Sequence, residues 1–291
     1  MQLVYYKSKS GNFGDDLNIW MWPQIFGSDF LQEHQEIAFF GIGSILMEDS
    51  VFIEQANTCE KKVVFGTGIR SINENIKIDD SWHIFFLRGP YSSLKLKGNL
   101  DHYIADAAYF LTLLPQYKSY INTPKKYKIS FIPYFMSVDK VDWQKICDDL
   151  SWNLILPTDL NNVEEFITEI AASEQIISEA MHGAMIADIV RVPWVRFRFY
   201  SHLHEGTMVS EWKWNDWLLS IGFHENKEIN IGLRNKKSTR GFIKKRKVKS
   251  LIYSQTKNID ESLFRLSSDE TLNNIVKQLK SKKEALIRFI D

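Results

Sequence analysis

The sequence predicts an α/β protein built from two successive units, each with a parallel sheet. Short, nearly continuous apolar runs alternate with longer segments of helical periodicity, which is typical of strands buried on both faces of a sheet. The alternation runs through residues 1–118 and starts again in residues 119–232, with residues 111–127, which hold prolines and several lysines, as the linker. Residues 233–291 contain a basic segment and a terminal amphipathic helix.

The individual elements follow from these runs. In the first unit, strands are expected at residues 3–6, 37–40, 62–65 and 84–87, and helices at 17–26, 51–57 and 90–96. In the second, strands are expected at 128–132, 153–156, 175–178 and 194–199, and helices at 141–150, 163–172 and 183–190. Two further helices are expected at 210–221 and 269–290.

Composition narrows the class of protein. The chain has 291 residues and a formal net charge of zero, from 36 basic and 36 acidic residues, which argues against a nucleic-acid partner. The two cysteines, Cys59 and Cys147, lie far apart in the sequence, so we expect no disulfide framework and a reducing, cytoplasmic setting. No signal peptide and no membrane-spanning run are expected.

Three glycine-bearing turns follow predicted strands of the first unit. They lie at residues 10–16, at Gly41 and Gly43, and at Gly66 and Gly68. In open parallel sheets, ligands bind outside the carboxyl ends of strands, where glycines allow backbone N–H groups to approach an anion. Each turn is also compatible with a simple strand-to-helix connection. None of them completes a dinucleotide-binding or P-loop motif, so a nucleotide site is not predicted.

A fourth turn places an arginine at the same edge. Arg88 ends a predicted strand, and Pro90 suits the first position of the following helix. A guanidinium at this edge matches phosphate or carboxylate groups with its planar set of donors. The alternatives are a surface arginine and a structural ion pair with Asp106.

The second unit carries the most informative turn. A buried strand ends at Ser178, and a helix of small residues begins near His182 and Gly183. This arrangement projects the imidazole at the mouth of the sheet, where a group with a pKa near 6.5 can exchange protons at neutral pH. The alternative is a histidine that only caps the helix or bonds to a loop. His202 and His204 have H-x-H spacing without an evident third ligand, so no metal site is predicted.

Together these segments resemble the polysaccharide pyruvyl transferase family in content and order. The resemblance covers roughly residues 1–200, and the segment Lys213–Trp217 resembles most the exopolysaccharide, ketal-forming branch. The segments that carry it are residues 11–16, 41–44, 64–68, 88–92, 106–108 and 178–188.

The resemblance implies two Rossmann-like domains facing one cleft, as in the B-type glycosyltransferases. It also implies phosphoenolpyruvate as donor, a sugar of a bacterial surface polysaccharide or its lipid-linked precursor as acceptor, and a cyclic ketal as product, with no cofactor. The family's essential histidine falls on His182, its arginine on Arg88, and a following serine on Ser92. We therefore expect His182 as general acid/base and Arg88 as the anion clamp.

The chain departs from the family at two places. Ala180 and Met181 stand where the family often has arginine and leucine. Arg196, Arg198 and His202 occupy the region in which a lysine often follows the next strand. Substrate contacts are expected from Asn12, Gly14, Asp15, Gly43, Ser44, Gly66, Thr67, Ser92, Glu179, Arg196, Arg198 and His202.

Several alternatives remain open at this point. Arg196 and Arg198 either clamp an anion together or form an ion-paired edge, and Glu179 either orients His182 or is a solvated helix-start carboxylate. Trp212, Trp214 and Trp217 either stack on sugar rings or face the core. The basic segment 234–249 is a solvated loop, or it contacts anionic lipid at the inner face of the membrane. The rival functions are a glycosyltransferase that uses a nucleotide-sugar and a non-catalytic sugar-binding assembly protein of the same fold.

Overall fold

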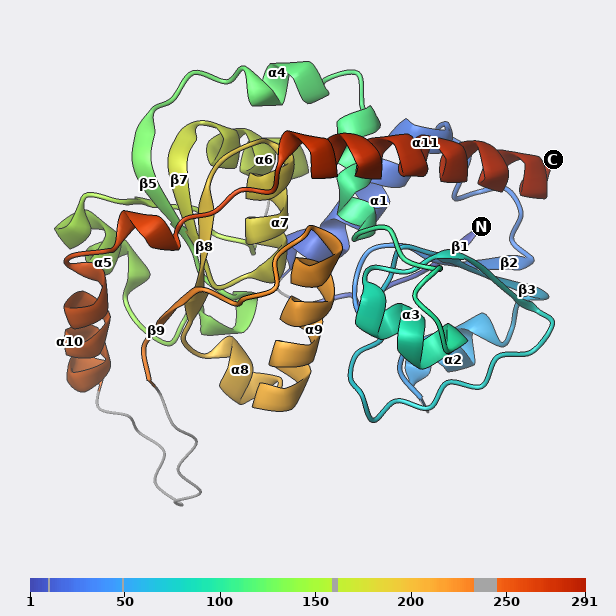
Figure 1. The fold of residues 1–291 in the computed structure, drawn as a ribbon, viewed down its shortest axis with the longest axis horizontal. Coiled ribbons are helices and arrows are strands. Elements are labelled where there is room, and N and C mark those ends of the chain that lie inside the picture. The colour runs from blue at the N-terminus through green and yellow to red at the C-terminus, as the bar shows by residue number, and fades with distance from the viewer. Residues whose placement is uncertain (10, 49, 159–161, 233–244) are drawn as a thin grey trace. The chain divides into compact units, whose positions relative to one another are not determined.

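The computed structural model describes residues 1–9, 11–48, 50–158, 162–232 and 245–291 (Figure 1). They divide into two compact units. Unit 1 comprises Met1–Tyr117, Glu211–Asn226 and Ser267–Asp291, and unit 2 comprises Lys118–Ser210 and Lys227–Leu266. The expected boundary near residue 118 agrees with this division, whereas contiguous domains at 119–232 and 233–291 do not, because two later segments of the chain belong to unit 1.

The sheet of unit 1 has four parallel strands. Its order β1-β2-β3-β4 follows the sequence, with β1 (Gln2–Val4), β2 (Ile37–Phe40), β3 (Lys61–Phe65) and β4 (Trp82–Phe86). All four strands were expected within about two residues. The accompanying helices are α1 (Phe13–Phe26), α2 (Val51–Ala56), α3 (Pro90–Lys97), the 3-10 helix η1 (Ala107–Leu113) and α11 (Asp269–Ile290).

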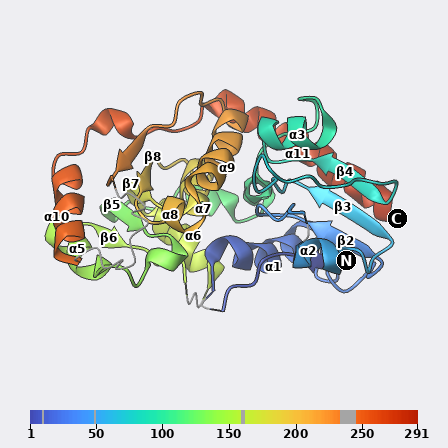
Figure 2. The same ribbon diagram turned by 90° about the horizontal axis from the view of Figure 1, so that it is seen from below.

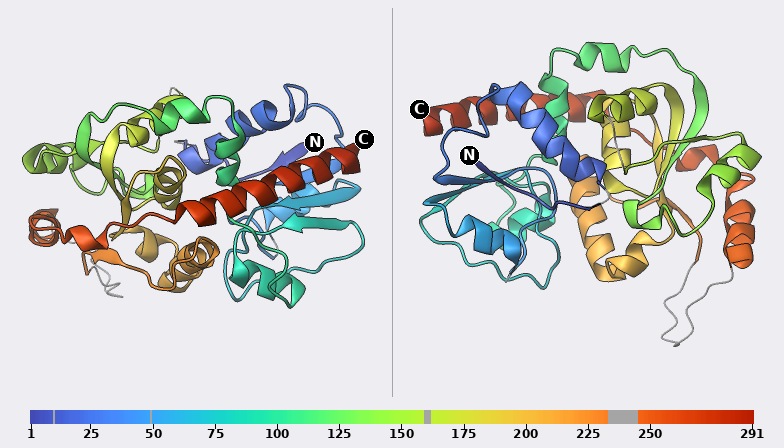
Figure 3. Two further views of the ribbon diagram at one scale, coloured as in Figure 1. Left: turned by 45° about the horizontal axis from the view of Figure 1, so that its top comes forward. Right: turned by 180° about the vertical axis from the view of Figure 1, so that it is seen from behind.

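Helices cover both faces of this sheet. Successive side chains of a strand point to opposite faces. Phe39 accordingly meets Trp22 of α1, with ring centroids 5.1 Å apart, whereas Phe40 packs in a cluster with Phe52 of α2. Figure 1 shows the strands of unit 1 between α1 and α2, Figure 2 shows the same unit from below, and Figure 3 shows α11 lying along the unit. All four residues of β2 are apolar and buried, because helices cover both faces of the sheet.

The sheet of unit 2 is also parallel, with the order β6-β5-β7-β8-β9. Its strands are β5 (Tyr127–Ile132), β6 (Asn153–Leu154), β7 (Ser173–Ser178), β8 (Trp194–Arg198) and β9 (Glu228–Asn230). The short strand β9 was not predicted, because its three residues include a single apolar side chain, Ile229. The expected α/β class with two parallel sheets is thus confirmed.

Helices also flank both faces of the second sheet, as Figure 1 shows. On one face, α5 (Trp143–Leu150) and α10 (Lys245–Thr256) contribute to a core cluster that includes Phe131 and Phe197. On the other, α6 (Val163–Ala171) and α7 (Met181–Ile189) pack together. Shorter elements are α4 (Tyr117–Ile121), η2 (Phe135–Ser137), α8 (Ser201–His204) and η3 (Glu261–Leu263), and α9 (Thr207–Ser220) belongs to unit 1 from Glu211 onward.

Two expectations concern membranes. Among the residues that the structure describes, no helix has the length and apolar character needed to cross a bilayer. Residues 233–244, which make up most of the basic segment 234–249, lie outside the described residues. Membrane contact through this segment therefore stays a prediction.

The terminal helix α11 has the bounds that its periodicity predicted. Its apolar stripe is buried at Leu272, Ile275, Leu279 and Leu286. Ser268 caps the helix, because its side-chain oxygen accepts a hydrogen bond from the backbone N–H of Thr271 at 3.1 Å. Burial of this stripe makes α11 part of the unit 1 core.

Truncating the stripe should destabilise the protein. Leu279→Ala should lower the free energy of unfolding by about 2–5 kcal/mol, because the side chain is fully buried and its removal leaves a cavity. The neighbouring exposed Lys280→Ala is the matched control, with an expected change within about 0.5 kcal/mol. Urea unfolding followed by tryptophan fluorescence measures both. Equal effects of the two substitutions would contradict the packing of α11.

Candidate active site

His182 lies at the carboxyl edge of the second sheet. Ile132 and Ser178, the last residues of β5 and β7, pair with each other, and Ser178 pairs with Arg196, two residues before the end of β8. The loops that follow these strands therefore leave the same edge of the sheet. His182 is the second residue of α7 and is half-buried. The N-cap residue, Ala180, offers no side-chain hydrogen bond to the first turn. The turn thus presents an imidazole beside a helix N-terminus, as the sequence predicted.

A close approach requires glycine next to this histidine. A Cβ atom added at Gly183 would overlap the Ser178 hydroxyl and come within 2.9 Å of the Ile132 side chain. The Ser178 hydroxyl itself donates to the carbonyl of Ala180 at 2.7 Å, which closes the turn. The start of α7 is therefore packed directly onto the ends of β5 and β7, and this packing restricts the position of His182.

Glu179 is the structural centre of this edge. Its buried carboxylate accepts hydrogen bonds from the backbone N–H groups of Tyr134 (3.1 Å), Tyr200 (2.6 Å) and Ser201 (2.7 Å), and from the Ser137 hydroxyl (2.5 Å). Burial raises the pKa of Glu179, and these four hydrogen bonds oppose the rise. The solvated-carboxylate interpretation is wrong. The geometry favours a residue that holds loops over one that contacts substrate, because loop groups occupy both oxygens.

The two arginines of β8 share a carboxylate. The Arg196 guanidinium is buried and lies 3.4 Å from Glu228 of β9, and it also donates to Ser210 at 3.2 Å. Arg198, two residues on, lies 3.4 Å from the same carboxylate. The arginines act on a common partner, as their spacing suggested, and the observed contacts are those of the ion-paired alternative. His202 is buried in α8.

In unit 1, Asn12 and Asp15 form the first turn of α1. Asn12 precedes the helix, and its side-chain amide donates to the Asp15 carboxylate at 2.6 Å. Asp15 is 9% exposed, and burial raises its pKa to about 7. The Asn12 bond and Lys213 oppose this rise, whereas repulsion from Asp16 adds to it. Asp15 is therefore a carboxyl group whose charge changes near neutral pH.

Arg88 is completely buried in unit 1 and is paired with Asp216. Its Nε atom donates to Asp216 Oδ2 at 3.1 Å, Nη2 lies 3.0 Å from the same oxygen, and Nη1 donates to the Ser44 hydroxyl. Asp216 also accepts hydrogen bonds from the backbone N–H and the hydroxyl of Ser92, at 3.0 and 2.7 Å. The Asp216 carboxylate, which sequence reasoning did not single out, thus joins Arg88 to Ser92, and Arg88 itself binds Ser44, so three of the expected site residues are connected.

This pairing changes the interpretation of Arg88. The surface-arginine alternative is wrong, and the partner at salt-bridge distance is Asp216 in place of Asp106. Asp106 is buried nearby, and burial raises its pKa to about 6, while the Arg88 charge opposes the rise. Gly68 leaves room for the guanidinium, which a Cβ atom at that position would overlap. Nε and Nη1 of Arg88 donate hydrogen bonds within the protein and Nη2 lies at salt-bridge distance from Asp216, so the geometry favours an arginine that holds the turns of unit 1.

The other expected residues of unit 1 lie in neighbouring turns. The Thr67 hydroxyl donates to the carbonyl of Gly43 at 3.0 Å, and Gly66 adopts a positive φ of 98°. Gly14 is buried in the first turn of α1. Of the three tryptophans, Trp214 and Trp217 are buried, which confirms the core alternative for them, and Trp212 donates to the carbonyl of Ile69 at 3.2 Å. No group of three or more potential metal ligands occurs within the described ranges.

Solved structures provide weak likenesses. A functionally uncharacterised protein of Klebsiella pneumoniae matches with a TM-score of 0.41 at 18% identity, over 74% of this chain and 90% of the other. The wall teichoic acid polymerase TagF matches with a TM-score of 0.34 at 12% identity, over 92% and 85% of the two chains.

Sequence comparison is more specific. The chain is 32% identical over 223 residues to the succinoglycan biosynthesis protein ExoV of Rhizobium meliloti (strain 1021). The alignment covers 76% of this chain and 65% of the relative, so the chain spans just under two thirds of that protein's length. The sequence pattern of polysaccharide pyruvyl transferases matches residues 22–199, a range that includes the turns of both Arg88 and His182. The chain therefore belongs to the polysaccharide pyruvyl transferase family.

Proposed function

We propose that this protein transfers the pyruvyl group of phosphoenolpyruvate to a sugar of a bacterial surface polysaccharide, or to its lipid-linked precursor, and forms a ketal. The observation that carries the proposal is the half-buried His182 at the N-terminus of α7, on the carboxyl edge of its sheet. Family membership supports a pyruvyl transfer in exopolysaccharide synthesis. The donor, the ketal and a cytoplasmic location are parts of the proposal.

The proposed chemistry needs one group that gives and takes protons. His182, as imidazolium, protonates the methylene carbon of phosphoenolpyruvate, and positive charge develops at C2. A sugar hydroxyl attacks C2 and returns its proton to His182, so the acid is restored. A second hydroxyl then displaces phosphate, which leaves with that hydroxyl's proton, and the ketal ring closes. General acid/base catalysis of this kind typically contributes about 10²–10⁴-fold in rate.

The electrostatics of the α7 turn are compatible with this role. A helix N-terminus disfavours the imidazolium and favours an anion. The bound donor carries a phosphate and a carboxylate, which favour the imidazolium. We expect the ligand to dominate, because two full anionic groups outweigh the fractional charge of a helix end. His182 would then be protonated when the donor is bound.

The carboxyl group of Asp15 supports a functional role for the first turn of α1. A buried carboxylate whose pKa is raised by burial costs stability at neutral pH, even though the Asn12 amide donates to it, and such groups concentrate at functional sites. We propose that Asn12, Gly14 and Asp15 contact substrate. The further contacts at Gly43, Gly66, Thr67 and His202 stay predictions, as does a peripheral membrane contact through residues 234–249.

Removal of the proposed acid should abolish most of the activity. His182→Ala should lower kcat for phosphate release from phosphoenolpyruvate by about 10²–10⁴-fold. The assay uses nitrophenyl glycosides and lipid-linked oligosaccharides as acceptors, and the exposed His224→Ala serves as the matched control. Full activity of His182→Ala would contradict the assignment. Binding of a nucleoside diphosphate without phosphate release would favour a glycosyltransferase.

Substitution of Arg88 should affect stability and activity together. Arg88→Ala leaves Asp216 buried without its cation, so the free energy of unfolding should fall by about 3–5 kcal/mol. The double variant Arg88→Ala/Asp216→Ala should lose less than the sum of the single losses. Thermal unfolding and phosphate release are measured on the same preparations. An inactive Arg88→Ala protein with unchanged stability would instead support direct contact with the donor.

The stability of the protein should depend on Asp15 and pH. The folded-state pKa of about 7 lies above the ordinary value of 3.8, so protonation favours the folded state. This contribution is complete below about pH 4 and is lost as the pH rises through 7. Asp15→Asn should therefore raise the free energy of unfolding by about 2–4 kcal/mol at roughly pH 8 and change it little near pH 4. Urea unfolding across this pH range measures how the free energy of unfolding depends on pH, and the exposed Asp80→Asn variant is the control.

A further inference from the structure

Two tyrosines are held beside the His182 turn by the same buried carboxylate. Tyr134 follows β5 and Tyr200 follows β8, and both donate their backbone N–H groups to Glu179. The ring of His204, in α8, contacts both of them, with its centroid 6.0 Å from that of Tyr134 and 6.1 Å from that of Tyr200. We call Tyr134, Tyr200 and His204 the aromatic platform. Its members leave the sheet at the edge that carries His182.

The aromatic platform combines partly exposed rings with a polar margin, in which the Lys140 ammonium lies over the Tyr200 ring. His204 is exposed, and both tyrosines are half-buried. The Tyr134 hydroxyl lies 3.4 Å from His204 Nδ1 and 3.5 Å from Glu205 Oε1, and Lys140 Nζ lies 5.2 Å from the Tyr200 ring centre. A pyranose has an apolar C–H face and a rim of hydroxyls. Aromatic faces bordered by a carboxylate, an ammonium and a phenol match both parts of that ligand.

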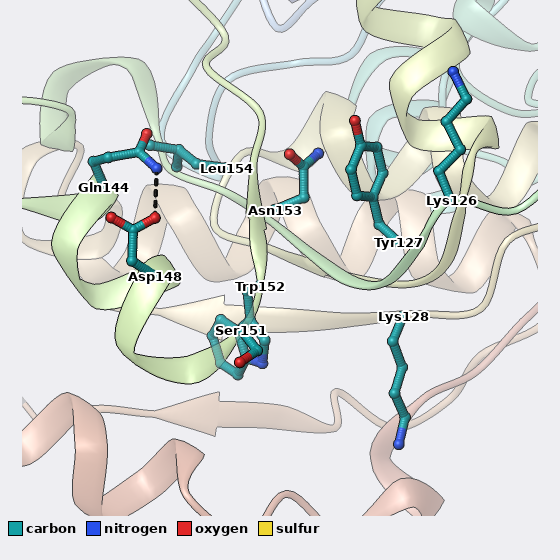
Figure 4. Close-up of a pocket in the computed structure, with 9 residues that line it drawn as sticks. All are labelled: Lys126, Tyr127, Lys128, Gln144, Asp148, Ser151, Trp152, Asn153 and Leu154. Carbon is teal, nitrogen blue, oxygen red and sulfur yellow. Dashed lines mark hydrogen bonds between the residues drawn. The ribbon is translucent and has the colours of Figure 1, made fainter.

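The pocket shown in Figure 4 lies at the opposite edge of the sheet from His182. It has a volume of about 360 Å³ and is lined by residues that include Lys126, Tyr127 and Asn153. These residues belong to the amino ends of β5 and β6, whereas His182 follows the carboxyl end of β7. In Figure 4, the side chains of Lys126 and Lys128 point away from each other. This pocket therefore lacks both the placement and the convergent charges of a site that serves His182.

We propose that the aromatic platform binds the acceptor sugar and presents its hydroxyl groups to the chemistry at His182. The proposal rests on the pyruvyl transfer proposed above and adds the acceptor subsite to it. Tyr134 and Tyr200 provide ring faces, and His204 joins them. Glu179 is a positioning residue, because it fixes the backbones of both tyrosines and both of its carboxylate oxygens accept hydrogen bonds from loop groups.

Kinetics that separate donor from acceptor test this subsite. Tyr134→Ala and Tyr200→Ala should each raise the KM for the acceptor about tenfold. The kcat, and the KM for phosphoenolpyruvate, should each change by less than about twofold. Tyr134→Phe keeps the ring and loses only the phenol of the polar margin, so its acceptor KM should rise less than that of Tyr134→Ala. Tyr127→Ala, at the opposite end of the strand that precedes Tyr134, is the matched control. Methyl glucoside and methyl galactoside are the acceptors, because a nitrophenyl group could itself stack on the platform.

Direct binding separates this proposal from the proposed function. Saturation-transfer NMR with the methyl glycosides, without phosphoenolpyruvate, should show binding that both alanine variants lose and Tyr127→Ala retains. That result supports the platform even where no pyruvyl transfer occurs. Pyruvyl transfer with unchanged acceptor KM in both variants would overturn the platform alone, as would absence of glycoside binding by the wild type. If an alanine variant fails to fold, leucine at the same position should show the same rise in acceptor KM.

Discussion

A buried carboxylate needs hydrogen-bond donors in place of water, and four groups from two loops donate to Glu179. The loops after β5 and β8 are bound through it to the end of β7, from which the His182 turn begins. Losing any one donor would leave a buried charge less well solvated, so the arrangement resists change. Close packing of Gly183 against β5 and β7 adds a steric limit. Together they place the imidazole at a defined point of the sheet edge.

The first unit depends on a similar constraint. Arg88 is buried, and Asp216 supplies its compensating charge while also binding the Ser92 turn. The guanidinium reaches Ser44 as well, so one ion pair connects the end of β4 with the start of α3 and the turn after β2. The arginine at this strand end therefore organises the turns of unit 1.

Local patterns predicted the elements well, and they failed where tertiary contacts decide. The bounds of β2 and α11, and the strand-turn-helix around His182, follow from periodicity and small residues in the sequence itself. The Arg88–Asp216 pair joins positions 128 residues apart, and the Glu179 bonds span 21 to 45 residues. No local sequence pattern predicts such distant partners. The short strand β9 and the return of α11 to unit 1 escaped prediction for the same reason.

The central claim is that His182 delivers a proton to the methylene carbon of phosphoenolpyruvate. Turnover in D₂O, with mass spectrometry of the pyruvylated sugar, tests it most directly. We expect at least one deuterium in each product methyl group, and more than one where the donor has exchanged before turnover. We also expect that wild-type enzyme exchanges the vinyl hydrogens of the donor with solvent, and that His182→Gln does not. Product without deuterium in its methyl group, or undiminished exchange by His182→Gln, would contradict the account.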